Sequence, residues 1–491
     1  MHTAKELATF CKKKGFIYPS SEIYGGVAGL YDYGHLGTRL KHNFENIWRE
    51  YFLKLNDNFH EIDTANIMHK NVFAASGHLE NFVDPIVHCS KCDFSERADH
   101  LLEKATGERF EGLSEDELTD AIQKHNLKCP NCQSEFKPVA VMNMMFAMSM
   151  GTSGNQTAYL RPETAQSPYV NFKLQFELLR KKLPLGLGLI GRAYRNEISP
   201  RNLTLRLREF QQAELQIFFN PNKISEHEEF QSISDYALRT MLEDDRHANM
   251  VVERTPEMLV QKGWPKFILF YLVQVQKFYL EVMKIPKDKF RLYEVVGKEK
   301  AHYNKLQFDI EIELADHGFT EIAGFHYRTD HDLHGHQDVS KEKMEILDEL
   351  TGERFIPHVL ELSFGVDRNV YLLLDQAYEN NKEREYVVLH LPNKLTPYFC
   401  AVFPLVKNKD ELTLLSRKLY KELQQKFAVL YDQSGSVGRR YARADEQGVR
   451  YCITVDFDSL EDDAVTIRDR ETTKQERIQI FDLTKKLQQL K

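Results

Sequence analysis

The sequence predicts an α+β protein built on an antiparallel sheet flanked by helices, with a smaller α/β domain at its C-terminal end. Residues 208–219 and 358–365 alternate apolar and polar side chains, as strands with one packed face do. Residues 36–55 instead repeat apolar side chains at helical spacing. After residue 385 the pattern changes to short strands around one helix, which indicates the separate α/β domain.

Size and composition set broad limits. The chain has 491 residues, enough for about three domains, and 42% of them are apolar, so it can bury a sizeable core. No apolar run approaches the ~20 residues that cross a bilayer, and no signal core follows the N-terminus. We therefore expect a soluble, cytoplasmic protein with no membrane partner. The net charge of −8 leaves a nucleic-acid partner open, because an RNA enzyme needs only one basic face.

Shifts in pattern divide the chain into parts. We predict an N-terminal part at 1–85, an insertion with two CxxC pairs at 86–138, a core at 139–380 containing a helical insertion at about 222–300, and a C-terminal domain at 386–491. Residues 139–219 are predicted as strand and loop. The polar run at 379–385 is predicted as a linker.

Two predicted strands at 187–197 and 208–219 are joined by a turn-rich loop at 198–202. On the second strand, one face carries polar or aromatic residues and the other carries apolar residues: Phe210, Gln212, Glu214 and Gln216 against Ala213, Leu215, Ile217 and Phe219. On the first strand, Arg195 and Glu197 share a face with Gly191 and Ala193. The polar face is either an active site or the solvated side of an ordinary antiparallel sheet.

The strand at 358–365 has the same two-faced pattern, with Glu361 and Ser363 on its polar side. Glu is depleted in strands, so its position here is informative. A helix is predicted from Asp367, with Arg368 in its first turn. An arginine is unfavourable at this positive end of a helix unless an anion such as a phosphate lies beside it. The alternative is a surface arginine paired with Asp367 or Asp375.

The seven cysteines favour a metal site over a disulfide framework, because their number is odd and no signal peptide is evident. Four of them form two CxxC pairs, Cys89 with Cys92 and Cys129 with Cys132. Two such pairs can supply four thiolates to one tetrahedral zinc ion. Free structural cysteines remain an alternative, as does His88 or His100 in place of one thiolate.

The C-terminal part is predicted to contain strands at 386–391, 428–431 and 451–455 and a helix at 411–427. The run at 435–441, with Arg443 close by, supplies basic and flexible residues. It is either a nucleic-acid contact or a solvated charged loop.

Arg195-Asn196-Glu197, followed by Arg206 to Phe210, resembles motif 2 of class II aminoacyl-tRNA synthetases, and residues 361–368 resemble motif 3. The chain as a whole is similar to the homodimeric glycyl-tRNA synthetase family. The supporting runs are residues 31–34, 97–101, 161–166, 195–201 and 435–441.

The resemblance implies an ATP site. Arg195 would hold the α-phosphate and Arg368 the γ-phosphate, and together with Glu197 they would carry catalysis. The remaining nucleotide positions implied by the family are Asn196, Leu205, Arg206, Leu207, Arg208, Glu209, Phe210, Gly365, Val366 and Asp367, with Glu321 and Ile322 toward ATP and its Mg²⁺.

The resemblance also implies a glycine site. Its positions are Arg97, Glu163, Phe210, Gln211, Gln212, Ala213, Glu214, Glu361, Leu362, Ser363, Phe364 and Gly365. Several carboxylates suit glycine, which offers only an ammonium group and small size. No amino acid is smaller than glycine, so excluding alanine sterically can suffice, and we expect no editing domain.

The implied reaction converts glycine and ATP to glycyl-adenylate with release of pyrophosphate. It then passes the glycyl group to the 3′ end of tRNA(Gly) with release of AMP. The glycine carboxylate is already a nucleophile, so fixed arginines and Mg²⁺ must stabilise the crowded phosphorus. The resemblance further implies that residues 36–55 form a homodimer interface, although a plain core helix would look similar, and that the C-terminal domain reads the anticodon. Arg97 lies between the cysteine pairs, so a structural zinc could position it.

Three positions depart from the family pattern: His35, Ser167 and Leu362. Leu362 should pack on the apolar side of its strand. Two other classes of protein remain as alternatives, a non-catalytic synthetase-like protein and a zinc-dependent nucleic-acid binding module. A class II synthetase for another small amino acid is the closest enzyme alternative.

Overall fold

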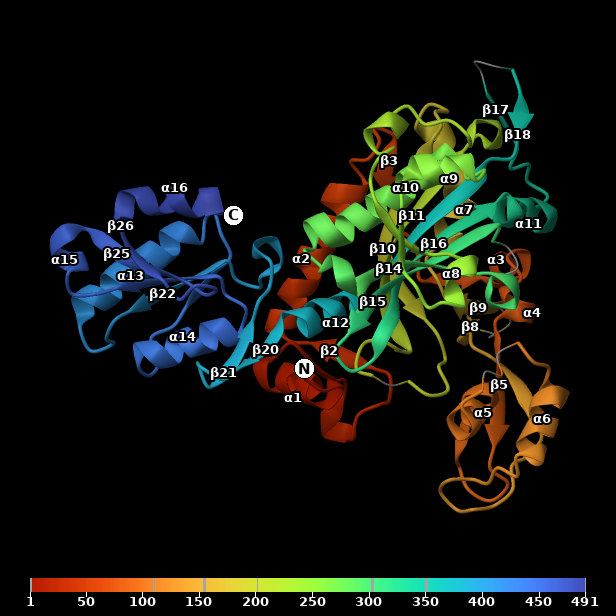
Figure 1. Cartoon of the computed structure of the whole chain (residues 1–491), viewed down its shortest axis with the longest axis horizontal. Coiled ribbons are helices and arrows are strands. Elements are labelled where there is room, and N and C mark those ends of the chain that lie inside the picture. Colours follow the sequence, from red (N-terminus) through yellow and green to blue (C-terminus); the bar gives the residue numbers. More distant parts are fainter. Residues whose placement is uncertain are drawn as a thin grey trace.

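The computed structural model describes residues 2–108, 110, 112–152, 156–200, 202–301, 304–348 and 352–490, so Arg201 of the predicted loop lies outside the described residues. Figure 1 shows a large body around one twisted sheet, an insertion that projects from it, and a C-terminal domain at the far end. Helix α1 (Ala4–Lys14) lies beside that domain, and Lys14 pairs with Glu446 there. None of the described helices has both the length and the apolar character needed to span a membrane.

The body is organised around a nine-stranded sheet in the spatial order β13-β12-β14-β15-β16-β19-β11-β10-β3. Its strands are β3 (Phe59–Glu61), β10 (Leu185–Tyr194), β11 (Glu209–Phe219), β12 (Leu238–Met241), β13 (Val252–Arg254), β14 (Phe290–Glu294), β15 (Leu306–Leu314), β16 (Gly318–Thr329) and β19 (His358–Gly365). From β14 to β10 all neighbours run antiparallel, whereas β3 pairs with β10, and β12 with β14, in parallel. The predicted antiparallel α+β fold is confirmed.

The apolar face of the sheet is covered by α2 (His35–Phe52), α10 (Lys266–Lys277) and α12 (Val366–Ala377). Phe364 of β19 packs its ring 4.7 Å from Phe52 and 6.3 Å from Trp48, both on α2. All three side chains are fully buried, and each such burial contributes about 1.5–3 kcal/mol. The helices predicted at 36–55 and from residue 367 are therefore present, and both serve the core of the chain.

The opposite face is covered at one end by α7 (Gln166–Leu178) and α11 (His331–Ser340). Tyr169 and Phe172 of α7 and Leu333 of α11 pack there against Leu187 and Phe218 of the sheet. Helix α7 corrects the prediction of strand and loop for residues 139–219. Its proline lies in the first turn, where a missing backbone N–H costs nothing.

The segment at 222–300 is not the helical insertion that was predicted. It contains α8 (Glu243–Arg246), α9 (Pro256–Gln261) and α10, but it also contributes strands β12, β13 and β14 to one edge of the main sheet. These strands have only three to five residues each, too few for the period-2 pattern to stand out between charged helices.

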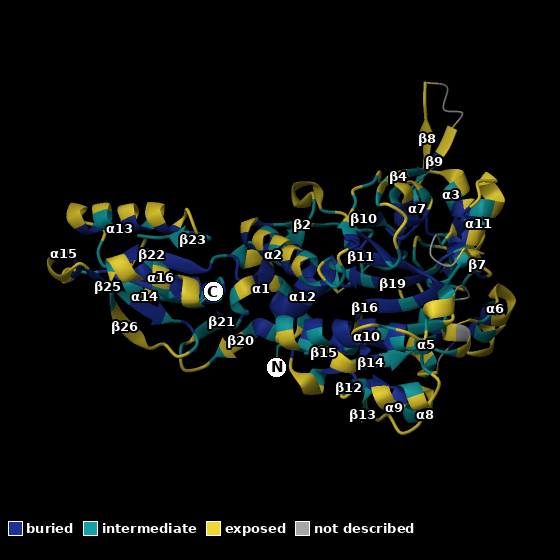
Figure 2. Ribbon diagram, turned by 90° about the horizontal axis from the view of Figure 1, so that it is seen from above, coloured by how far each residue is buried: buried dark blue, intermediate teal, exposed yellow. Residues whose placement is uncertain are grey.

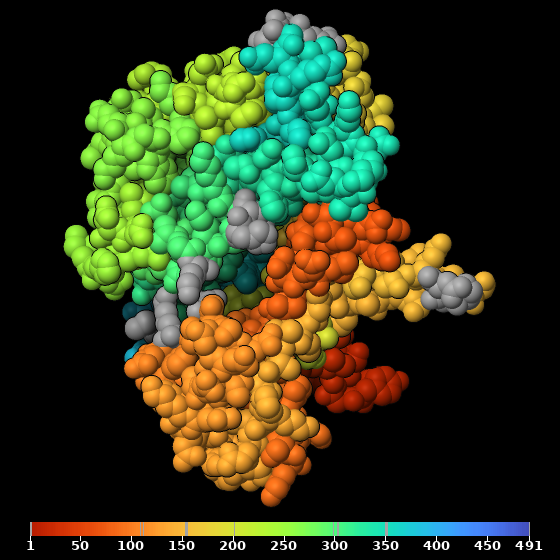
Figure 3. Space-filling model, turned by 90° about the vertical axis from the view of Figure 1, so that its right-hand side faces the viewer, coloured from red at the N-terminus to blue at the C-terminus, as the bar shows by residue number. Residues whose placement is uncertain are grey.

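The insertion is a small unit with its own core. Strands β5 (Val83–His88), β6 (Ser95–Arg97) and β7 (Ala140–Asn143) form a three-stranded sheet beside α5 (Ala98–Thr106) and α6 (Glu115–Lys124). Val87, Leu102, Leu118 and Ile122 are buried together between these elements. Figure 3 shows the insertion, in orange, set apart from the green and teal body, with the surface hollowed between them.

Three smaller sheets lie in the described part of the body. Strands β1 (Ile17–Pro19) and β2 (Tyr31–Tyr33) pair near the N-terminus, and β4 (Ile67–His69), β8 (Ala147–Met150) and β9 (Gln156–Leu160) form a second small sheet. Helices α3 (Lys70–Ala75) and α4 (His78–Asn81) follow β4, and β17 (Ile346–Leu347) pairs with β18 (Arg354–Phe355). Figure 2 shows β8 and β9 as an exposed projection, whereas the central strands of the main sheet are buried.

The C-terminal domain has a five-stranded sheet in the order β23-β22-β24-β25-β26. Its elements are β22 (Cys400–Pro404), α13 (Asp410–Leu423), β23 (Val429–Tyr431), α14 (Val437–Glu446), β24 (Tyr451–Val455), α15 (Ser459–Asp462), β25 (Ala464–Asp469), β26 (Gln475–Gln479) and α16 (Ile480–Leu490). The run predicted as basic and flexible mostly belongs to α14, which Ser436 caps. Arg440 there is buried and donates to the Leu405 carbonyl at 3.0 Å, whereas Arg439 is exposed.

The polar run at 379–385 is not an extended linker. Strands β20 (Tyr378–Asn381) and β21 (Tyr386–Leu389) pair antiparallel, and the run forms the end of this hairpin. The strand predicted at 386–391 therefore lies outside the C-terminal sheet. Turn-forming polar residues mark both linkers and hairpin ends, so composition could not separate the two.

Candidate functional site

The register of three neighbouring strands arranges polar residues in rows across one face of the sheet. Glu214 on β11 lies opposite Ser363 on β19, which lies opposite Gly324 on β16. In the adjacent row Glu361 lies opposite His326. Because side chains alternate along a strand, all five residues point to the same face.

A cluster of three carboxylates forms the centre of the site. Glu163, Glu214 and Glu361 are 9%, 2% and 5% exposed, so the polar face here is buried and is not an ordinary solvated surface. The Ser363 hydroxyl donates to Glu214 Oε1 at 2.7 Å, and Gln216 Nε2 donates to Glu361 Oε2 at 3.1 Å. The structure thus brings the predicted Glu163, Glu214, Glu361 and Ser363 together.

Arg328, at the end of β16, supplies positive charge to this cluster and was not predicted. It is 1% exposed and donates to both carboxylate oxygens of Asp332, at 2.8 and 3.0 Å. It also donates to Glu361 Oε2 at 2.9 Å and lies 3.6 Å from Glu163 Oε1. The sequence did offer one signal for this ion pair: Arg328 stands four residues before Asp332, where β16 is followed by α11.

The surroundings shift the pKa values of two carboxyl groups in this cluster in opposite directions. Burial, with the negative charges of Glu361 and Glu163, raises the pKa of Glu214 to about 8. Burial also opposes ionisation of Glu163, but the nearby His78 and Arg328 outweigh it and lower the pKa of Glu163 below its ordinary value. Among the described residues Glu214 forms no ion pair, although the charge of Arg161 acts on it, and an added ammonium group would stabilise its charge.

Buried Arg161 holds the loop that carries Glu163. Its Nε donates to the Arg192 carbonyl at 2.7 Å, and its Nη1 lies 3.3 Å from the Ser167 hydroxyl. The guanidinium passes directly over Gly191, where a Cβ would lie 2.1 Å from Nη2. Ser167, which departs from the family pattern, therefore takes part in anchoring this loop.

Arg195 lies just beyond the end of β10, because that strand stops at Tyr194 and not at residue 197 as predicted. Its guanidinium stacks between the rings of Phe82 and Phe210, at 5.3 and 5.2 Å, and its Nε donates to the Pro162 carbonyl at 3.0 Å. Two aromatic faces and one carbonyl hold the side chain in place. This positioning suits an arginine that must meet an anion.

Residues next to Arg195 form a connected loop. Glu197 is buried and accepts from Arg206 Nε at 2.7 Å, while Arg208 Nε donates to the Glu197 carbonyl at 3.0 Å. The Asn196 N–H donates to the Met144 carbonyl at 2.7 Å. Glu209 instead pairs with Arg192 on the neighbouring strand.

Arg368, in the first turn of α12, pairs with Glu321 and not with Asp367 or Asp375. Its Nη1 lies 3.1 Å from Glu321 Oε1, and its Nε donates to the Leu205 carbonyl at 3.2 Å. The Glu321 carboxylate raises the pKa of Arg368, and burial together with Glu321 raises the pKa of Asp309 to about 8. The carboxyl groups of Glu321 and Asp309 thus lie beside a fixed arginine.

Not every residue of the predicted walls faces the site, because alternate side chains of a strand point to opposite faces. The buried apolar residues among them belong to cores: Leu205, Leu207, Ala213, Ile322, Leu362, Phe364 and Val366. Gln211 Nε2 donates to Glu45 on α2, and Asp367 accepts from Tyr33 at 2.5 Å. The side chains of these residues therefore point away from the polar face, and Leu362 packs as expected. Gln212 faces the site and accepts from the Thr164 N–H at 3.1 Å.

Arg97 lies at the end of β6 in the insertion and forms ion pairs with Asp84, at 3.0 Å, and with Asp99. The charges of Glu197 and Arg206 act on Asp84, so this pair lies beside the loop that follows Arg195. The contacts described for Arg97 thus join it to Asp84 and Asp99, beside the loop that follows Arg195.

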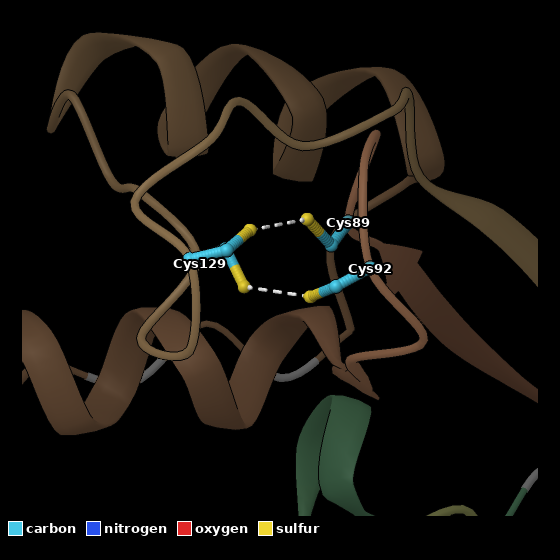
Figure 4. Close-up of side chains that lie close together, drawn as sticks. Cys89, Cys92 and Cys129 are labelled. Carbon is cyan, nitrogen blue, oxygen red and sulfur yellow. Dashed lines mark hydrogen bonds between the residues drawn. The ribbon is translucent and has the colours of Figure 1, made fainter.

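The four predicted cysteines converge at the tip of the insertion, with all four sulfur atoms within 4.8 Å of one another. Figure 4 shows Cys89 and Cys92 facing Cys129 across two loops. The Cys89–Cys132 and Cys92–Cys129 sulfur distances are 3.4 and 3.5 Å. A tetrahedral ion with bonds of about 2.3 Å fits this spacing and this donor set.

The C-terminal domain, residues 400–490, matches the anticodon binding domain family. A solved prolyl-tRNA synthetase from Cryptosporidium parvum, complexed with L-proline and AMP, shares the fold with a TM-score of 0.59 and 12% identity, covering 100% of this chain and 75% of that one. This fold, with its anticodon binding domain, is that of a class II aminoacyl-tRNA synthetase.

Sequence relatives give the finer assignment. The glycine--tRNA ligase of Pyrococcus furiosus is 38% identical, over 99% of this chain and 98% of its own length. That of Aeropyrum pernix is 36% identical over 98% and 96%, and that of Methanocaldococcus jannaschii is 34% identical over 98% and 97%. The chain belongs to the glycine--tRNA ligase family.

Proposed function

We propose that the enzyme activates glycine with ATP to glycyl-adenylate and transfers the glycyl group to the 3′ end of tRNA(Gly). The observation that carries this proposal is the buried cluster of Glu163, Glu214 and Glu361, together with two arginines whose side chains are held by backbone carbonyl groups. A pocket with more carboxylates than cations suits an amino acid recognised chiefly by its ammonium group.

In the first step, a glycine carboxylate oxygen attacks the α-phosphorus of ATP and pyrophosphate leaves. Glu214, with Ser363 beside it, binds the ammonium group and directs the carboxylate outward. Arg195 would stabilise the charge that builds on the α-phosphate, and Arg368 would hold the γ-phosphate. No general base is needed, because the attacking group is already ionised.

Glu321, with Asp309 beside it, would hold Mg²⁺, since clustered carboxylate oxygens are the ligands this ion takes. When bound, Mg²⁺ neutralises phosphate charge during the transfer. Ion pairing between Glu321 and Arg368 positions that carboxylate before ATP arrives. Asn196, Arg206 and Arg208 would line the nucleotide from the neighbouring loop.

In the second step, the ribose hydroxyl at the 3′ end of tRNA attacks the glycyl carbonyl and AMP leaves. The C-terminal domain would read the anticodon, and exposed Arg439 near the start of α14 is positioned to meet phosphates there. We also propose that the enzyme is a cytoplasmic homodimer. The apolar residues of α2 serve the chain's own core, so its polar side and the unpaired edge of β3 are the surfaces left for a partner.

The decisive experiment is pyrophosphate exchange into ATP that depends on the amino acid. Glycine should support exchange, and alanine and serine should not. Arg195→Ala should abolish exchange while leaving thermal unfolding within a few degrees of wild type. Exchange that is absent with glycine, or stronger with serine or alanine, would overturn the proposal.

The four cysteines would hold a structural zinc ion that fixes the insertion. A strong chelator, or Cys89→Ser with Cys129→Ser, should then release one zinc per chain and raise the KM for glycine or ATP, because Arg97 and its partner Asp84 lose their support. Cys400→Ser, which alters a buried cysteine in the other domain, is the matched control and should retain the metal. An unchanged KM after verified zinc loss would separate the metal from the site.

A further inference from the structure

His326 is a histidine on the active-site face of β16 that neither the motifs nor the proposed reaction uses. It lies opposite Glu361 in the strand register, and its Nε2 is 3.7 Å from Glu361 Oε1. Its side chain is 17% exposed, so part of the ring remains accessible. The imidazole therefore lies beside the cluster of three carboxylates.

The ring lies over Gly324, its neighbour two residues earlier on the same face. A Cβ placed on Gly324 would lie 2.3 Å from His326 Nε2 and 3.2 Å from two ring carbons. Gly324 itself lies opposite Ser363, the residue that donates to Glu214. The imidazole thus fills the space beside Ser363 that the glycine leaves open.

A hydrogen bond fixes the orientation of this ring. Asn304, which is 5% exposed, lies with its Nδ2 3.0 Å from His326 Nδ1. Because the amide N–H donates, Nδ1 accepts, and the ring proton is on Nε2 facing Glu361. The burial of the ring lowers the pKa of His326, which keeps the imidazole neutral. A neutral, oriented ring can stand beside a bound ammonium group without repelling it.

We propose that His326 determines specificity for glycine by filling the volume over Gly324 that a larger amino acid's side chain would need. This inference rests on the proposed function and names the residue that enforces it. Binding energy alone discriminates poorly between amino acids that differ by one methyl group, so a rigid wall is the effective means of rejecting alanine. Here the wall is a ring held by Asn304 on one side and by Gly324 beneath it.

The first test compares His326→Ala with wild type in exchange assays using glycine, alanine and serine. Removing the ring should raise the alanine-to-glycine ratio of kcat/KM about 10-fold or more, within the about 10–200-fold range that one carbon is worth. His326→Gln, whose side chain retains most of the length, should keep the ratio near the wild-type value. An unchanged ratio in His326→Ala, or an equal rise in both variants, would overturn the inference.

The second test uses the close contact between the ring and Gly324. Gly324→Ala should displace the ring and reduce glycine-dependent exchange, and adding His326→Ala should restore much of it, because the methyl group then occupies vacated space. Equal loss in the single and double variants would overturn the steric role. Wild-type exchange with glycine is measured in the same series. If wild type itself fails, the proposed function is wrong, whereas failure confined to the variants removes only this inference.

Discussion

Two buried ion networks in the molecule have opposite balances of charge. In the catalytic body, one arginine, Arg328, serves Asp332 with two hydrogen bonds, Glu361 with one, and Glu163 at 3.6 Å. In the C-terminal domain, one carboxylate, fully buried Asp445, serves two arginines. Arg468 binds both its oxygens at 2.8 and 2.9 Å, and Arg384 donates to it at 3.1 Å.

This difference in charge balance distinguishes a ligand-binding site from a network that only stabilises the fold. The C-terminal network connects α14 to β25 and to the β20–β21 hairpin, and its extra positive charge belongs to half-buried Arg384. In the catalytic network, Glu214 adds a further buried carboxyl that forms no ion pair within the described part of the chain. Burying more carboxylates than cations destabilises the fold unless a further cation binds. Such an excess is therefore expected where the substrate itself supplies the positive charge.

Replacing Arg328 should have the largest effect, because it leaves three carboxyl groups buried without their counter-charge. Arg328→Met should lower the free energy of unfolding by about 3–5 kcal/mol and abolish glycine-dependent exchange. Urea unfolding and exchange assays measure the two effects. Arg328→Lys keeps the charge but not the two-point contact with Asp332, so its stability and exchange activity should lie between those of wild type and Arg328→Met. Wild-type stability in Arg328→Met would show that the network is not held by this arginine.

The matched change in the other network should affect stability alone. Asp445→Asn removes the charge that Arg468 and Arg384 share, and should cost about 1.5–3 kcal/mol, the usual range for hydrogen bonds to charged groups. Glycine-dependent exchange should stay within about twofold of wild type, because it needs no contact with this domain, whereas charging of tRNA should fall. A comparable loss of exchange would mean that the two networks are coupled.

Glu214→Gln should have the opposite effect to Asp445→Asn: it should impair the use of glycine and leave stability intact. The change removes a carboxyl that burial and its acidic neighbours destabilise, so unfolding should be unchanged or slightly harder. The kcat/KM for glycine should fall about 100-fold, or about 2.7 kcal/mol, because the ammonium group loses its charged partner. The exchange rate at saturating and subsaturating glycine measures this, with Gln212→Ala as a neighbouring control that should have a smaller effect. If the variant loses stability but still uses glycine normally, Glu214 supports the fold and does not bind glycine.

The parts of this site that the sequence predicted are those with a local pattern. Glu214 and Glu361 could be placed on polar strand faces because alternation requires only neighbouring residues. Arg328 and His326 gain their roles from the register between β16 and β19, and nothing within a short window shows that register. The predicted wall of the glycine site took residues 361–365 as one continuous stretch. It therefore included Phe364, whose side chain points to the core.

The same limit explains the errors in the fold. The three strands in 222–300 have only three to five residues each, so no local periodicity marked them. Residues 379–385 have the composition of a linker, and only the pairing of β20 with β21 makes them the end of a hairpin. Long elements with a clear amphipathic period, such as α2 and β11, were predicted within a few residues of their observed bounds.

The smallest expected effect is a pH dependence that separates the two networks. Without glycine, the pKa of Glu214 is about 8, above that of an ordinary carboxyl, so its contribution to stability is present at low pH and is lost as pH rises toward 8. Glycine binding requires the ionised form, so lowering the pH from 8 to 7 should raise the KM for glycine by somewhat less than tenfold. Glu214→Gln should show no such slope, and Asp445→Asn should keep the wild-type slope. A KM that is independent of pH in wild type would mean that Glu214 is already ionised, and that the acidic excess is neutralised by another cation.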